Sequence, residues 1–120
     1  MKLKDFDFRI WDNGKYHYPI KINNDIVDIN LSIGINDEIE LFTGLYDKNG
    51  KKIYEGDILY YFKDYSKGEV FKYQVLFKEG AFYLFESYDG FVDDEDLISE
   101  FDLKELQVVG NIHENKELLK

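Results

Sequence analysis

The stretch from Thr43 to Leu59, TGLYDKNGKKIYEGDIL, constrains the fold more than any other part of the chain. Its Asp47-Lys48-Asn49-Gly50 segment is typical of a hairpin turn, because Asp accepts hydrogen bonds from the turn backbone and Gly takes the left-handed conformation. We therefore expect strands at about 39–43 and 51–54, and a sharp bend before a third strand at 57–63. The residues assigned to this structural turn motif are Gly44, Asp47, Asn49, Gly50, Gly56 and Asp57.

Apolar and polar residues alternate along much of the remaining chain, and a period of two predicts half-buried strands. Pro19 favours a sheet edge for the second of these strands. The acids at 93–96 precede Leu97 and Ile98 and predict a short helix, because acids suit the positive end of a helix dipole. A second short helix is expected at 114–119. The additional strands are expected at 5–10, 16–22, 29–35, 71–78, 81–87 and 106–112.

The pattern as a whole predicts one mainly β domain over residues 1–120. We expect a small antiparallel β-barrel-like fold with one or two short helices near the C-terminus. Closure into a barrel is favoured because it removes exposed sheet edges.

Composition excludes several classes of function. The chain has 25 acidic and 15 basic residues, for a net charge of -10, so phosphate backbones and anionic lipid should repel it. Direct nucleic-acid binding and membrane binding are therefore not expected. Cysteine is absent, which excludes disulfides and thiolate metal sites. The first residues lack the apolar core of a signal peptide, and the predicted location is cytoplasmic.

Three blocks of the sequence resemble the YopX-like family of phage and prophage proteins. They are FRIWD at 8–12, the segment 42–59, and VGNIHEN at 109–115 followed by ELL at 117–119. Lys116 stands where the family usually has proline, which puts the geometry of the C-terminal turn in doubt. The resemblance implies a β-rich fold, a phage or prophage gene in a bacterial host, and a homo-oligomer. It implies no catalytic residues.

Catalytic and cofactor motifs are absent from the sequence. His17 and His113 have no neighbouring cysteine or HExxH partner, so no metal site is predicted. Glu55 and Asp57 could share one face of a strand as an acid–base or metal-binding pair, but a structural role in the turn is favoured. No cofactor is expected, and the protein is predicted not to be an enzyme.

Two groups of aromatic residues are candidates for contact surfaces. Phe8, Arg9 and Trp11 could form a ligand platform, but a core Trp11 and an ion-paired Arg9 are favoured. Aromatic residues crowd the segment 60–65, so some must lie outside the core, and tyrosine is common at protein interfaces. The candidate self-association residues are Tyr60, Tyr61 and Tyr65.

An acidic tract is the strongest candidate for binding a different partner. Carboxylates on a rigid surface can imitate the phosphates of nucleic acid, although such a run is more often a solvated face. The tract comprises Asp89, Asp93, Asp94, Glu95, Asp96, Glu100, Asp102 and Glu105.

Two functional hypotheses follow. The first is a non-enzymatic phage or prophage accessory protein that self-associates and acts through protein contacts. The alternative is an acidic inhibitor of a host DNA- or RNA-binding defence protein, such as a nuclease, which it would engage through the acidic tract.

Overall fold

A computed structural model describes residues 7–22, 25–28, 38–62, 70–88 and 91–119, and most of them lie in β-strands. Short 3₁₀ turns occupy Ile98–Glu100 (η3), Leu103–Glu105 (η4) and Lys116–Leu119 (η5). None of the described helices is long and apolar enough to cross a membrane. The strands are β1 (Phe8–Asp12), β2 (Lys15–His17), β3 (Ile20–Ile22), β4 (Asp25–Asp28), β5 (Glu38–Tyr46), β6 (Lys52–Tyr54), β7 (Asp57–Tyr61), β8 (Phe71–Lys78), β9 (Ala81–Tyr88), β10 (Phe91–Leu97) and β11 (Leu106–Asn111).

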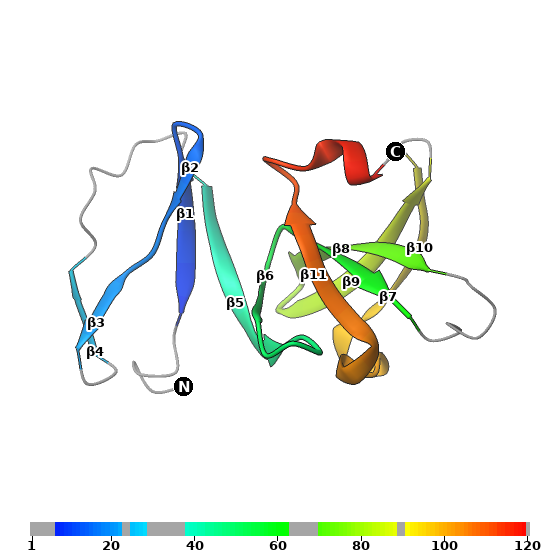
Figure 1. The fold of residues 1–120 in the computed structure, drawn as a ribbon, viewed down its shortest axis with the longest axis horizontal. Helices are drawn as coiled ribbons and strands as arrows, with labels where there is room; N and C mark the ends of the chain where they lie inside the picture. The colour runs from blue at the N-terminus through cyan, green and yellow to red at the C-terminus, as the bar shows by residue number, and fades with distance from the viewer. Residues whose placement is uncertain (1–6, 23–24, 29–37, 63–69, 89–90, 120) are drawn as a thin grey trace.

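Two sheets make up most of the fold. Strands β2, β1, β5 and β6 form one, and β10, β9, β8, β7 and β11 form the other, with β3 and β4 as a separate hairpin. The five-stranded sheet curls into a half-barrel, and the four-stranded sheet stands beside it (Figure 1). All pairings between the described strands are antiparallel. The predicted mainly β antiparallel fold is confirmed, but its strands curl without closing a barrel.

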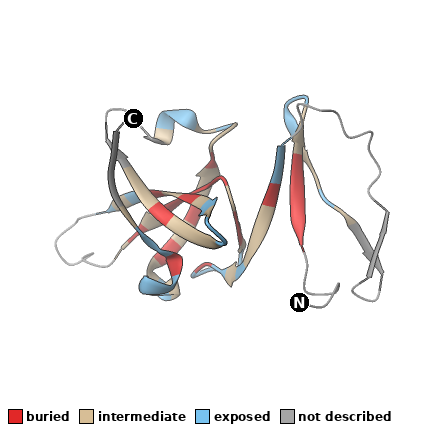
Figure 2. Cartoon of the chain, turned by 180° about the vertical axis from the view of Figure 1, so that it is seen from behind, coloured by how far each residue is buried: buried red, intermediate tan, exposed pale blue. Residues whose placement is uncertain are grey.

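The main hydrophobic core lies inside the curled sheet, where the buried residues of β7, β8 and β11 gather (Figure 2). Tyr61 belongs to this core: it is 8% exposed, and its ring packs edge-on against Tyr73 and Phe101. Tyr61 thus contributes to the core of this chain, and its role in self-association stays a prediction. The core residues are Ile53, Leu59, Tyr61, Tyr73, Val75, Leu84, Ile98, Leu106 and Val108.

The hairpin turn between β5 and β6 forms where the Asp47-Lys48-Asn49-Gly50 segment predicted it. Asp47 is buried, and its Oδ1 accepts hydrogen bonds from the Asn49 and Lys51 N–H groups at 2.8 and 2.9 Å. Its Oδ2 accepts one from the Val108 N–H at 2.9 Å. One carboxylate therefore closes the turn and also attaches it to β11 of the other sheet.

Replacing Asp47 with alanine is expected to lower the free energy of unfolding by roughly 2–4 kcal/mol, because three N–H groups lose a charged acceptor. The stability of Asp47→Asn should lie between those of the unaltered protein and the alanine variant, since an amide keeps one acceptor oxygen but loses the charge. Urea unfolding of the three proteins measures the order. A loss below about 1 kcal/mol for the alanine variant would mean that the carboxylate does not join the sheets.

The predicted C-terminal helices are not confirmed, because this part of the chain forms a strand and 3₁₀ turns. The acids at 93–96 lie in β10, which pairs with β9 along most of its length. That long-range pairing satisfies the backbone and overrides the local preference for a helix. The segment 114–119 contains the four-residue 3₁₀ turn η5, which is too short for a stable α-helix.

Strand boundaries also differ from the sequence prediction. The single strand predicted at 16–22 is two short strands, β2 and β3, separated by Tyr18 and Pro19. This break fits proline, which has no N–H for a sheet ladder. The strand predicted at 29–35 lies outside the described residues.

Candidate functional site: an acidic cleft between the sheets

Arg9 joins the two sheets through its guanidinium group. Its Nε donates to Glu40 Oε1 at 2.8 Å within the four-stranded sheet, and its NH2 nitrogen donates to Asp57 Oδ1 at 2.7 Å in β7. The same NH2 nitrogen contacts the Glu55 carbonyl oxygen at 3.3 Å. Side chains of Arg9, Glu40 and Asp57 are all at least nine-tenths buried. This buried ion triad is the polar centre of the interface between the sheets.

Aromatic rings enclose the Arg9 guanidinium. Its central carbon lies 4.0 Å from the ring centroid of Tyr16 and 4.6 Å from that of Tyr54, distances typical of cation–π contacts. Burial lowers the pKa of Arg9, but Asp57 and Glu40 outweigh burial and raise it overall. Burial raises the pKa of the Asp57 carboxyl, and the attraction of Arg9 opposes that shift. The prediction that Arg9 is an ion-pair partner is confirmed.

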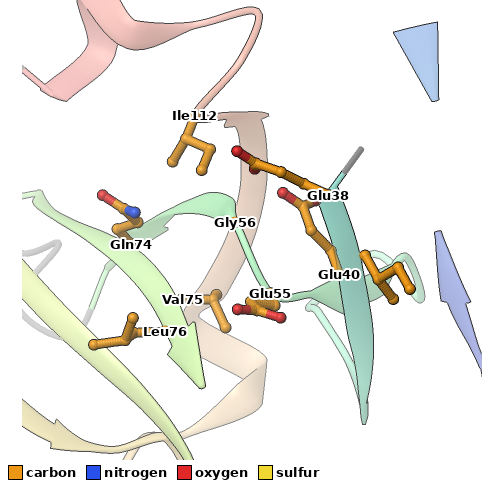
Figure 3. A pocket seen from close by; sticks show the side chains of 9 residues that line it. Glu38, Glu40, Glu55, Gly56, Gln74, Val75, Leu76 and Ile112 are labelled. Carbon is orange, nitrogen blue, oxygen red and sulfur yellow. The ribbon is translucent and has the colours of Figure 1, made fainter. Parts of the chain in front are cut away.

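A cleft of about 330 Å³ opens next to this triad, between β5 and the curled sheet (Figure 3). Three carboxylates, from Glu38, Glu40 and Glu55, line one side, and apolar side chains with the Gln74 amide line the other. We call this space the intersheet cleft. Its lining residues are Glu38, Ile39, Glu40, Glu55, Gly56, Gln74, Val75, Leu76 and Ile112.

Opposing effects act on the Glu55 carboxyl at the cleft. Burial raises the pKa of Glu55, a hydrogen bond from the Leu41 N–H lowers it, Glu40 and Glu38 raise it, and Arg9 lowers it. Since Arg9 is already bonded to Glu40 and Asp57, two carboxylates act on Glu55 against one cation that is paired elsewhere. A cation entering the cleft would stabilise the ionised form of Glu55.

His113 lies beside the cleft and reaches the same carboxylates from the C-terminal part of the chain. Its Nε2 is 3.0 Å from Glu40 Oε2 and 3.5 Å from Glu38 Oε2. The imidazole stacks on Trp11, with ring centroids 4.4 Å apart and an interplanar angle of 6°. Trp11 therefore orients the histidine, a role the sequence did not indicate for either residue.

The Glu55 and Asp57 side chains have different partners. Asp57 bonds to Arg9 through Oδ1, and its Oδ2 accepts the Tyr54 N–H at 2.8 Å within the turn. Glu55 instead lines the cleft. The structural interpretation of Asp57 is therefore confirmed. Positive φ angles at Gly44, Gly50 and Gly56 likewise fit the role predicted for these glycines.

The acidic tract is spread over β10 and the turns that follow it. Asp96, Glu100 and Asp102 are exposed, Glu105 is half-buried, and Glu95 pairs with Lys78. Asp93 and Asp94 lie within β10, whereas Asp89 lies outside the described residues. Among the described residues of the tract, none lines the intersheet cleft.

Of the three tyrosines proposed for self-association, the structure describes Tyr60 and Tyr61. Tyr60 is half-buried and its ring contacts Phe62, Tyr61 is in the core, and Tyr65 lies outside the described residues.

Sequence reasoning missed most of the cleft residues. Glu38 and Glu40 did carry a signal, because residues two apart on a strand share a face. Nothing local connected them to His113, which is 73 residues beyond Glu40. Their meeting depends on how the two sheets pack.

Comparison with known proteins places the chain in a family. The family model described as YopX protein matches residues 7–120. The chain belongs to the YopX family. This membership confirms the resemblance of the three sequence blocks.

Two solved structures resemble this YopX-family chain over nearly its whole length. Protein EF1440 from Enterococcus faecalis is 26% identical with a TM-score of 0.60, and the match covers 96% of this chain and 98% of that one. YopX from Bacillus subtilis is 20% identical with a TM-score of 0.61, covering 95% and 98% of the two chains. Neither name states an activity or a ligand. No curated protein is significantly similar in sequence.

Proposed function

We propose that this YopX-family chain is a non-enzymatic binding module whose intersheet cleft takes a lysine or arginine side chain of a partner protein. The observation that carries the proposal is the set of three carboxylates around a cleft whose nearest guanidinium, Arg9, is already paired. A positively charged group in the cleft would supply the missing countercharge.

The walls of the cleft suit the rest of such a side chain. Val75, Leu76 and Ile112 present apolar surface opposite the carboxylates. Lysine and arginine carry apolar methylene stems that pack on such surface while the charged end bonds to acids. A volume of about 330 Å³ is also larger than a single ion requires.

The lining supports binding more than catalysis. Among its described residues there is no serine, threonine or cysteine that could act as a nucleophile. Asp57, one member of the acid pair considered from the sequence, is held by Arg9 and the Tyr54 N–H.

Binding of capped lysine and capped arginine should cause saturable amide shifts at Gly56, Val75 and Ile112, followed by NMR titration. Capped norleucine, which lacks the charge, should cause none. Glu55→Gln is expected to weaken lysine and arginine binding by roughly tenfold, equivalent to about 1.4 kcal/mol. The matched control is Glu100→Gln, which removes the same charge from an exposed position outside the cleft.

An equal loss in Glu55→Gln and Glu100→Gln would show that the net charge, rather than the cleft, attracts the ligand. Equal shifts with norleucine would show that the carboxylates do not select for charge. Either result contradicts the proposal.

The exposure of Asp96, Glu100 and Asp102 favours a second candidate, the acidic inhibitor of a host nucleic-acid-binding protein. Such a surface would act through a long-range field, so its affinity should fall steeply with salt. If Glu100→Gln weakens binding to a nucleic-acid-binding protein more than Glu55→Gln does, the result would favour this candidate. Self-association and a phage or prophage origin stay predictions from the sequence.

A further inference from the structure

We propose that Glu38, Glu40 and His113 form a site for a divalent transition-metal ion, with Zn²⁺ as the best match. The site lies at the edge of the intersheet cleft, and this inference goes beyond the binding of a basic side chain. Each of the three residues offers one ligand atom, and these atoms lie within 4.8 Å of one another.

The spacing of the ligand atoms fits a small tetrahedral ion. His113 Nε2 is 3.0 Å from Glu40 Oε2 and 3.5 Å from Glu38 Oε2. With metal–ligand bonds of about 2.0–2.2 Å, two ligands of a tetrahedral ion are about 3.3–3.6 Å apart. Because all three atoms lie within 4.8 Å of one another and the Glu38 side chain is exposed, a movement of Glu38 would bring them onto one ion, leaving a fourth position for water.

The donor set selects the class of metal. One imidazole nitrogen with two carboxylate oxygens suits Zn²⁺ and related first-row ions, whereas Mg²⁺ and Ca²⁺ prefer oxygen ligands alone. In the absence of an ion, the contact between His113 Nε2 and Glu40 Oε2 is an ordinary hydrogen bond. Metal binding would replace the shared proton, as it does at other histidine ligands.

The surrounding residues hold the ligands in position. Glu40 Oε1 accepts hydrogen bonds from Arg9 Nε at 2.8 Å and from the Tyr16 hydroxyl at 2.9 Å, so Oε2 is the oxygen turned toward His113. Trp11 stacks on the imidazole. Such outer contacts orient the ligands of metal sites and raise metal affinity.

The backbone beside His113 is also held. Asn111 Oδ1 accepts the N–H groups of His113 and Glu114 at 3.0 and 2.9 Å. The Glu38 side chain, in contrast, is 61% exposed. Two ligands are therefore in place before an ion arrives, and the third can close over it from solvent.

The test is calorimetric titration of ZnCl₂ into the untagged full chain after removal of metals with a chelator. We expect saturable binding of one ion per chain, and weaker binding of MgCl₂. His113→Gln and Glu38→Gln should each weaken zinc binding by at least about tenfold. His17→Gln is the matched histidine control and should bind as the unaltered protein does.

Glu38→Gln keeps the test decisive if His113→Gln does not fold, because the Glu38 side chain is mostly exposed. A second readout is the visible absorption of bound Co²⁺, whose intensity reports tetrahedral coordination and should be lost in Glu38→Gln. The proposal would be overturned by the absence of saturable zinc binding. It would equally be overturned by zinc binding that survives both ligand substitutions or depends on His17.

Different variants test the zinc site and the basic side-chain site independently. Glu55→Gln should weaken lysine binding and leave zinc affinity unchanged, because Glu55 is not among the three ligands. His113→Gln should weaken zinc binding and leave lysine binding unchanged, since His113 does not line the cleft.

Discussion

Replacing Arg9 with methionine is expected to lower the free energy of unfolding by about 3–5 kcal/mol at neutral pH, measured by urea unfolding. Methionine fills similar space but leaves Glu40 and Asp57 buried without their cation. Arg9→Lys should also destabilise the protein, although less, because a single ammonium group cannot reproduce the two directed bonds of the guanidinium.

The pH dependence distinguishes lost charge pairing from lost packing. Burial already raises the pKa of the Asp57 carboxyl, and in Arg9→Met it should rise further because the opposing attraction of Arg9 is lost. The folded variant then binds this proton at a higher pH than the folded unaltered protein does, so it should gain more stability as pH falls toward the range of the Asp57 carboxyl. Its deficit relative to the unaltered protein should therefore shrink in acid. A deficit that is independent of pH would contradict an electrostatic role for Arg9.

Gly56→Ala is expected to cost roughly 3 kcal/mol or more, whereas Gly50→Ala should cost about 1–2 kcal/mol. Both glycines have positive φ, at 85° and 77°, so both substitutions carry the left-handed penalty. A Cβ at Gly56 would lie 2.5 Å from Glu40 Oε2, while a Cβ at Gly50 would meet nothing within 4 Å. Urea unfolding of the two variants measures the difference.

The contacts around Gly56 leave no room for an added Cβ. Glu40 is held by Arg9, Tyr16 and His113, and the Gly56 backbone donates to Val75 and accepts from Ile112 across the sheets. Equal costs for the two alanine substitutions would mean that Glu40 gives way easily. The buried ion triad would then be less rigid than its contacts indicate.

Features that arise from near neighbours in the chain were predictable. The Asp47 turn follows from carboxylate and glycine chemistry within a few residues, and alternating apolar side chains identified β8 and β9 closely. Turn geometry and strand periodicity depend on local sterics and on which side chains avoid water, and the sequence records both directly.

Features that need distant partners were decided by the tertiary structure. Residues 93–96 form part of a strand because they lie in β10, which pairs with β9. Tyr61 became a core residue because the sheet curls around it. Arg9 bonds to residues 31 and 48 positions away, and His113 reaches Glu40 across 73. The amino-acid sequence by itself thus determined the turns, most strands and the family. The ion triad and the acidic cleft exist only because two sheets pack together, which brings charged side chains into contact at distances in sequence that no local pattern encodes.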